Sequence, residues 1–164
     1  MSLPALRIRR RCSGSPDSSP NPGDTFAFQA PRTLAGDYAA GETRTVSVAP
    51  GNYAVTEVVP DGWTLASITC TSASGASQSA VDVAAATTSV TLAAGDTVTC
   101  TYVNDQVLGA IKITKTSSKT DNVLAGATFS ITSGGAPIAG SPFTTDANGE
   151  ICVEGLVFGD YVVT

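Results

Sequence analysis

Apolar and polar residues alternate along most of the chain, and glycine, proline or short polar turns interrupt the alternation every several residues. In the segment DTVTCTY, Val98, Cys100 and Tyr102 fall on one side of an extended backbone and the intervening threonines fall on the other. Helix-forming residues are scarce apart from alanine, whereas Thr, Val, Ser and Gly dominate. The pattern therefore predicts an all-β chain.

The spacing of the alternating segments predicts a sandwich of two sheets in the first part of the chain. Turn signals such as PGN, PDG, SGAS and AAGD separate short predicted strands, which lie at residues 24–29, 43–48, 52–59, 63–71, 78–83, 88–92 and 97–103. The later part predicts further strands at residues 110–116, 127–132, 143–145, 150–154 and 159–164. We interpret DANGE, at residues 146–150, as a hairpin turn, because it lacks the later bidentate acid of an EF-hand calcium loop.

A hexapeptide that occurs twice indicates an internal repeat. GNYAVT at residues 51–56 and GDYVVT at residues 159–164 each follow an earlier strand that contains Phe-x-Phe or Phe-x-Ile. We therefore predict a disordered segment over residues 1–21, a complete sandwich over 22–106, and a domain over 107–164 that lacks its last strands. The predicted fold class is a tandem of Ig-like or prealbumin-like β-sandwiches, the second truncated.

Cys70 and Cys100 lie in matching strand contexts. Ala66, Ile68 and Cys70 share one strand face, and Cys100 shares a face with apolar neighbours, so both cysteines are expected to point inward. A disulfide between them would close a loop of about 30 residues and stabilise the domain by roughly 3 to 4 kcal/mol. Two buried thiols are the alternative. Cys152 has no equivalent partner in the sequence, and we expect its partner to lie beyond Thr164.

The composition argues against catalysis. Only 14% of the residues are charged, and there is no histidine, the commonest general base and a frequent metal ligand. Without histidine, neither a Cys-His nor a Ser-His pair can form. Glu150 and Glu154 flank a predicted strand, where we expect them to be solvated. We therefore expect no enzyme, no cofactor and no metal site.

The charge distribution argues against nucleic acid and membrane partners. The net charge is −5, but four of the nine cations are Arg7, Arg9, Arg10 and Arg11, so five cations face fourteen acids in the remainder. Such an acidic body does not suit nucleic acid or anionic membrane, and we interpret the arginine run as part of the disordered end instead of a targeting segment. No apolar stretch reaches the ~18 residues that span a membrane, and residues 1–11 lack the apolar region of a signal peptide. The chain is either cytosolic or a piece of a longer secreted protein.

Three polar residues are expected on inward strand faces. Alternation places Lys115 of AIKITK, Glu57 of GNYAVTE and Asn104 of CTYVN on the same faces as their apolar neighbours. Lysine and glutamate are almost never fully buried unless they are paired. The alternative is that each lies at a strand end, where its side chain reaches water.

These motifs resemble a known family. The lysine on the first strand, LAGATF, TDANG and the Gly-x-Tyr strand of residues 109–164 look like the start of a SpaA/Cna-B-type prealbumin-like domain, a building block of Gram-positive pilins and adhesin stalks. FAF, PGNYAVTEVVPDGW, ITCT and VTCTYVN in the earlier part are similar to related disulfide-bearing repeats of such surface proteins. The resemblance covers about residues 22–164, and the combination of motifs is more specific than any single one.

The resemblance implies an isopeptide cross-link, in which a lysine on the first strand condenses with an asparagine or aspartate on the last strand while a glutamate moves protons. By position, Lys115 matches the lysine of the second unit, whereas Glu57 and Asn104 match the glutamate and the asparagine of the first. Neither unit holds all three residues.

The position of the first unit's lysine, counted back from Phe26, is occupied by Cys12. We therefore expect no intramolecular isopeptide bond in this chain. Either the first unit relies on a Cys70–Cys100 bridge instead, or the N-terminal residues stand in place of a native strand that carried lysine.

We expect a structural repeat region of an extracellular bacterial surface protein, an adhesin or pilin-like stalk attached to the cell wall or cell surface, with its signal and anchor outside this sequence. The expected partners are neighbouring repeats of the same chain and a host or cell-surface glycan or protein. The alternative is a carbohydrate- or matrix-binding module that uses Trp63 as an aromatic platform, although a single tryptophan after a turn more often fills a core or an edge.

Overall fold

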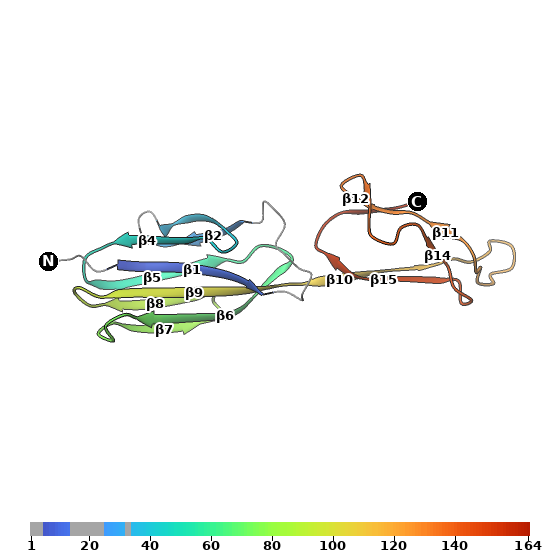
Figure 1. Ribbon diagram of the computed structural model, residues 1–164. Coiled ribbons are helices and arrows are strands. Elements are labelled where there is room, and N and C mark those ends of the chain that lie inside the picture. Colours follow the sequence, from blue (N-terminus) through green and yellow to red (C-terminus); the bar gives the residue numbers. More distant parts are fainter. Residues whose placement is uncertain (1–4, 14–24, 32–33) are drawn as a thin grey trace. The chain divides into compact units, whose positions relative to one another are not determined.

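The computed structural model describes residues 5–13, 25–31 and 34–164, and these form strands, turns and loops without an α-helix (Figure 1). The chain divides into two compact units, the first ending at Gln106 and the second running from Val107 to Thr164. The all-β prediction is confirmed.

The first unit is built from two sheets. One has the strand order β4 (Thr43–Ser47), β1 (Ala5–Ser13), β9 (Thr97–Gln106) and β6 (Trp63–Ser72), with β1 and β9 parallel. The other is antiparallel, with the order β3 (Gly36–Ala39), β2 (Thr25–Gln29), β5 (Gly51–Val58), β8 (Thr87–Leu92) and β7 (Gln78–Asp82). The predicted two-sheet sandwich is therefore confirmed.

Inward-facing residues of both sheets form one core. Phe28 forms an aromatic cluster with Tyr38 and Tyr102. The centroid of its ring lies 4.8 Å from that of Tyr38 and 4.9 Å from that of Tyr102, in edge-to-face geometry. On β9 every second residue from Val98 to Asn104 is buried, and the threonines between them are only half-buried. The period of two in the sequence thus corresponds to the two faces of this strand.

A β-bulge in β6 shifts the predicted strand faces near its start. The register between β6 and β9 changes between Leu65 and Ser67, so that Leu65 packs against the core and Ala66 is exposed. The prediction that Ala66 shares the inner face with Ile68 is therefore wrong, because strict alternation assumes one residue per ladder position.

Strand β1 corrects the prediction of a disordered segment over residues 1–21. Ala5–Ser13 pair antiparallel with β4 and parallel with β9. Residues 1–4 and 14–21 of the predicted segment lie outside the described residues. The arginine run suggested a solvated end, but backbone hydrogen bonds to two neighbouring strands stabilise an extended segment whatever its side chains are.

The disulfide prediction is confirmed. Cys70 and Cys100 are direct cross-strand partners on β6 and β9, and their sulfur atoms are bonded at 2.10 Å. The bridge joins the edge strand β6 covalently to β9.

Asp96 organises the loop that joins β6 to β7. Its buried carboxylate accepts hydrogen bonds from Ser72 Oγ at 2.6 Å and from the backbone nitrogens of Ser74 and Ser77 at 2.9 and 3.1 Å. The hydrogen bonds from Ser72 and Ser77, above all, hold the pKa of Asp96 far below its ordinary value. One carboxylate thus satisfies backbone groups that have no strand partner.

The second unit contains smaller sheets. β10 (Leu108–Thr114) pairs with β15 (Glu150–Val157), β11 (Thr128–Phe129) pairs with β14 (Phe143–Thr144), and a third sheet has the order β13 (Ala136–Pro137), β12 (Ile131–Ser133) and β16 (Tyr161–Val163). The buried large apolar side chains of residues 107–164 are Ile131 and Ile151. This unit therefore has a much thinner core than the first.

The predicted DANGE turn is present in the second unit. The backbone nitrogen of Gly149 donates to the carbonyl of Asp146 at 2.9 Å, and the φ of Gly149 is 70°. A Cβ at Gly149 would lie 2.7 Å from the carbonyl oxygen of Lys115, so both the backbone conformation and the close approach require glycine.

Replacing Asp96 with asparagine should reduce the thermal stability of the first unit at pH 7 and weaken its pH dependence. The folded-state pKa of Asp96 lies below its unfolded value, so its contribution to stability is present above pH about 4 and declines as the pH falls below that value. Thermal melting at pH 7 and pH 3, followed by the fluorescence of Trp63, measures both effects. An equal loss of melting temperature on acidification in the wild type and in Asp96→Asn would contradict this role.

Candidate functional site

A buried polar pair lies between the two sheets of the first unit. Glu57 on β5 is 3% exposed and Asn104 on β9 is fully buried. The Asn104 Nδ2 atom donates a hydrogen bond to Glu57 Oε1 at 3.1 Å. Alternation brings both side chains inward, because Val55 and Tyr102, two residues earlier on the same strands, also face the core. For these two residues the structure supports the inward orientation over the strand-end alternative.

Tyr102 adds a second polar contact beside this pair. Its hydroxyl donates to the carbonyl oxygen of Val55 at 3.1 Å and lies 3.0 Å from Thr88 Oγ1, and all three groups are buried. Burial raises the pKa of Tyr102 to about 12, with a smaller contribution from the charge of Glu57. Tyr102 therefore remains a neutral donor that connects β9 to both β5 and β8.

The parallel register places β1 beside Asn104. Cys12 is the Cα partner of Asn104 in the β1–β9 ladder. Cys12 is also the position to which the count from Phe26 leads, where the resemblance implies a lysine. The backbone thus brings the three positions of the implied triad to one region of the first unit, but the residue at the first position is cysteine.

The structure places Lys115 at the surface. It follows the last residue of β10, its side chain is exposed, and its Nζ atom donates to the carbonyl oxygen of Thr116 at 3.3 Å. The expectation that Lys115 enters the core is wrong, and the strand-end alternative holds because the chain leaves β10 one residue earlier. Lys112 on β10 is also exposed, and its Nζ atom lies 2.8 Å from Glu150 Oε1.

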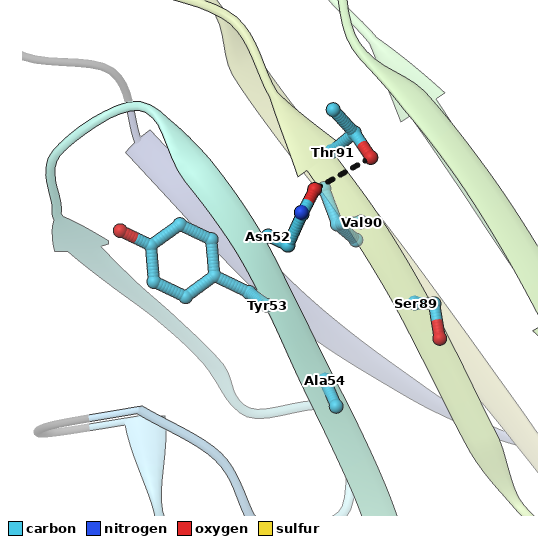
Figure 2. Close-up of a pocket in the computed structure, with 6 residues that line it drawn as sticks. All are labelled: Asn52, Tyr53, Ala54, Ser89, Val90 and Thr91. Atoms are coloured by element: carbon cyan, nitrogen blue, oxygen red, sulfur yellow. Dashed lines mark hydrogen bonds between the residues drawn. The ribbon is translucent and has the colours of Figure 1, made fainter.

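A shallow hollow lies on strands β5 and β8, away from the buried pair. It has a volume of about 460 Å³ and is lined by Asn52, Tyr53, Ala54, Ser89, Val90 and Thr91. The Thr91 hydroxyl donates a hydrogen bond of 2.9 Å to Asn52 Oδ1 on the neighbouring strand, drawn as a dashed line in Figure 2. The Tyr53 hydroxyl donates to the carbonyl of Ala49. The side chains of Asn52, Tyr53 and Thr91 are therefore already hydrogen-bonded within the protein.

Two other predicted features have simple positions. Cys152 on β15 is a free thiol with an exposed side chain. Trp63, the candidate platform, is half-buried and packs edge to face against Phe26, with ring centroids 5.3 Å apart.

No helix in the described part of the chain is long and apolar enough to cross a membrane.

Sequence reasoning missed the buried threonine that bonds Tyr102. Thr88 is fully buried and bonded to Tyr102, yet its segment TTSVTL predicted only an alternating strand. The alternation did contain the signal, because Thr88 shares a face with Val90 and Leu92. A buried threonine on such a face requires a hydrogen-bond partner.

Two family models match the chain. Both are described as prealbumin-like fold domains of the SpaA type, and they match residues 17–106 and residues 109–164. No curated protein matches the chain.

Two solved structures are similar over nearly the whole chain. The structure of the Bacillus anthracis TIE protein matches with a TM-score of 0.55 at 19% identity, over 99% of this chain and 28% of that one. A streptococcal ancillary pilin matches with a TM-score of 0.42 at 18% identity, over 97% of this chain and 52% of that one. This chain thus spans about a quarter to a half of the length of these proteins, and the first similarity supports the fold.

Replacing Asn104 with alanine should lower the unfolding free energy of the first unit by about 1–3 kcal/mol, because the buried carboxylate of Glu57 loses a hydrogen-bond donor. Urea unfolding followed by Trp63 fluorescence measures the change. Thr101→Ala, on the outer face of the same strand, is the matched control and should change stability by less than about 0.5 kcal/mol. Equal effects of the two substitutions would contradict the pairing.

Proposed function

The chain belongs to the prealbumin-like fold domains of the SpaA type, and we propose that it is a structural, load-bearing region of an extracellular bacterial surface protein. In this role its folded units transmit tension along the chain and carry out no catalytic turnover. The observation that carries the proposal is the parallel pairing of β1 with β9.

The geometry of this pairing suits a load along the chain. β1 and β9 lie side by side, and within the described residues they are the first and last strands of the first unit (Figure 1). Tension applied at Ala5 and at Gln106 pulls the two parallel strands past each other along their length. The hydrogen bonds of the ladder, which extends from the Ala5–Thr97 pair to the Ser13–Asp105 pair, are then loaded together instead of one at a time.

The disulfide supports the same role. It links β9 covalently to β6. The segment between Cys70 and Cys100, which are 30 residues apart in the sequence, therefore cannot be stretched when the unit unfolds under force. Disulfides persist in oxidising compartments outside the cytosol, which supports a location outside the cell. We propose attachment to the cell wall or cell surface, with neighbouring repeats of the same chain as the first partners.

The carbohydrate- or matrix-binding alternative has less support. Trp63, its candidate platform, packs against the edge of the core. In the hollow on β5 and β8, Asn52 and Thr91 bond each other and the Tyr53 hydroxyl bonds the carbonyl of Ala49. We therefore propose the structural role first, and binding of a host or cell-surface glycan or protein only as the second candidate.

We also propose that Glu57 and Asn104 are the glutamate and the asparagine of an isopeptide site in which the reactive lysine is absent. In the reaction implied by the resemblance, a lysine Nζ attacks the Asn104 carboxamide carbon, an amide bond forms, and ammonia leaves while the glutamate moves the protons. The Glu57–Asn104 hydrogen bond and the register of Cys12 support this assignment. Lys115 is exposed in the second unit, where residues 107–164 supply no matching pair.

Single-molecule pulling from both ends of the chain tests the load-bearing role. We expect two unfolding events, a weaker one for the second unit with its thin core and a stronger one for the first unit, because forced unfolding follows the height of the unfolding barrier. Reduction of the disulfide should lengthen the stronger event by roughly 100 Å, since it releases the 30-residue loop. Unfolding of the first unit at or below the force of the second would contradict the proposal.

Replacing Cys12 with lysine tests the incomplete isopeptide site. We expect the intact mass of the folded Cys12→Lys variant to fall by one ammonia, because residue 12 is the register partner of Asn104 in the β1–β9 ladder. The same substitution combined with Asn104→Ala is the matched control and should lose nothing. Loss of ammonia from the unsubstituted chain, or none from a folded Cys12→Lys variant, would refute this assignment.

A further inference from the structure

Strand β1 brings three arginines to one face of the first unit. Directly paired residues of neighbouring strands belong to the same face of a sheet. Ile8 on β1 pairs with Cys100, which is fully buried on the inner face. The alternate positions of β1 therefore belong to the outer face. They include Arg7, Arg9 and Arg11, whose partners on β9 are Thr99, Thr101 and Val103.

We call Arg7, Arg9 and Arg11 the arginine row. Alternate residues of a strand lie about 6.5–7 Å apart, because each residue advances the chain by roughly 3.3 Å. Backbone pairing with β4 on one side and with β9 on the other keeps β1 extended over this length. Arginine is always protonated in proteins. The row therefore carries three positive charges at regular intervals along a straight line.

The residues that flank the arginine row carry hydroxyl groups and no charge. On the outer face, the strands beside the row contribute exposed or half-buried threonines, which are Thr43 and Thr45 on β4, Thr99 and Thr101 on β9, and Thr69 and Thr71 on β6. The aromatic residues of these four described strands are Tyr102, which is buried, and Trp63, which packs against the core. The outer face around the row is therefore polar and has no aromatic platform.

The arginine row contrasts with the charge of the rest of the chain. Residues 12–164 contain five cations and fourteen acids. The described strands of the opposite sheet contain no lysine or arginine, and Asp37 and Asp82 belong to its outer face. On the face of the row, the acid of the four described strands is Asp105, near the end of β9. A group of cations on an acidic molecule directs a polyanion to that one face.

We propose that this outer face binds a linear polyanion whose charges are phosphodiesters joined by flexible spacers without rings, as in poly(glycerol phosphate). A straight row of regularly spaced cations matches a chain of regularly spaced anions. The guanidinium group of arginine binds phosphate oxygens through paired N–H donors, and the threonine hydroxyls on both sides of the row supply further donors.

The absence of an aromatic platform on these described strands selects the type of polymer. Single-stranded nucleic acids and sugar rings are commonly bound by stacking on aromatic side chains. The outer face around the arginine row offers hydroxyl groups instead. A phosphodiester chain with ring-free spacers therefore fits this face better than single-stranded DNA or a sulfated glycan does.

Titration of the full chain with a short synthetic poly(glycerol phosphate) tests the proposal. We expect saturable binding that weakens as the salt concentration rises. The slope of log affinity against log salt should be roughly −2, by analogy with the 0.7 counterions that single-stranded nucleic acid releases per neutralised phosphate. Single-stranded DNA with the same number of phosphates should bind more weakly. In NMR spectra of the unsubstituted chain, shift changes should be confined to β1 and its neighbouring strands β4, β9 and β6.

Two triple variants separate the arginine row from the overall charge. The test variant combines Arg7→Gln, Arg9→Gln and Arg11→Gln. The control combines Lys112→Gln, Lys115→Gln and Lys119→Gln, which removes the same charge from the second unit. The test variant should bind the polymer at least about tenfold more weakly, with a flat salt dependence. The control should bind like the unsubstituted chain.

Four results would overturn the proposal. They are absent binding, an equal loss of affinity in the two triple variants, equal binding of single-stranded DNA, and shift changes centred outside β1 and its neighbouring strands. The NMR result requires no substitution, so it decides the matter even where the test variant does not fold. Neither measurement applies force, so this proposal and the load-bearing role can fail separately.

Discussion

Backbone hydrogen bonding of β9 is the interaction on which the rest of the first unit depends. This strand lies between β1 and β6 in its sheet, so its backbone groups have partners along both edges. Its inward side chains supply the disulfide through Cys100, the aromatic cluster through Tyr102 and the polar pair through Asn104. The core, the covalent bridge and the candidate site therefore share one strand, and the proposed load path passes through it.

The first unit combines few buried aromatic residues with a disulfide and several buried hydrogen bonds. Aromatic residues make up 6% of the sequence, and small residues such as threonine, serine and glycine are abundant. A small domain of this kind buries a limited apolar area. The disulfide, the hydrogen bonds to Asp96 and the Tyr102–Thr88 contact add order without additional apolar volume. Residues 107–164 contain no disulfide and only two large buried apolar side chains, so the core of the second unit is thinner.

Much of the fold could be predicted from the sequence, because a half-buried strand carries its own pattern. The alternation on β9 and β5 predicted the inward faces of Cys100, Glu57 and Asn104 correctly. The pattern failed to predict strand β1, because its arginine-rich sequence does not alternate like a half-buried strand. Its pairing with β4 and β9 depends on backbone hydrogen bonds alone. It also failed at Ala66, where a bulge adds a residue, and at Lys115, where the strand ends one residue earlier. The hydrogen bond between Glu57 and Asn104 could not be predicted, because the two residues lie on different sheets. Sequence periodicity gives the face of each strand but not how the sheets pack against each other.

The parallel pairing of β1 with β9 underlies the proposed load-bearing role of the first unit. Nuclear Overhauser contacts between the backbone protons of the two strands, measured by NMR on the full chain, test it most directly. We expect contacts in the parallel register, with Ile8 beside Cys100 and Cys12 beside Asn104, and slow amide exchange along Ala5–Ser13. Fast exchange over those residues together with an absence of contacts to β9 would contradict it.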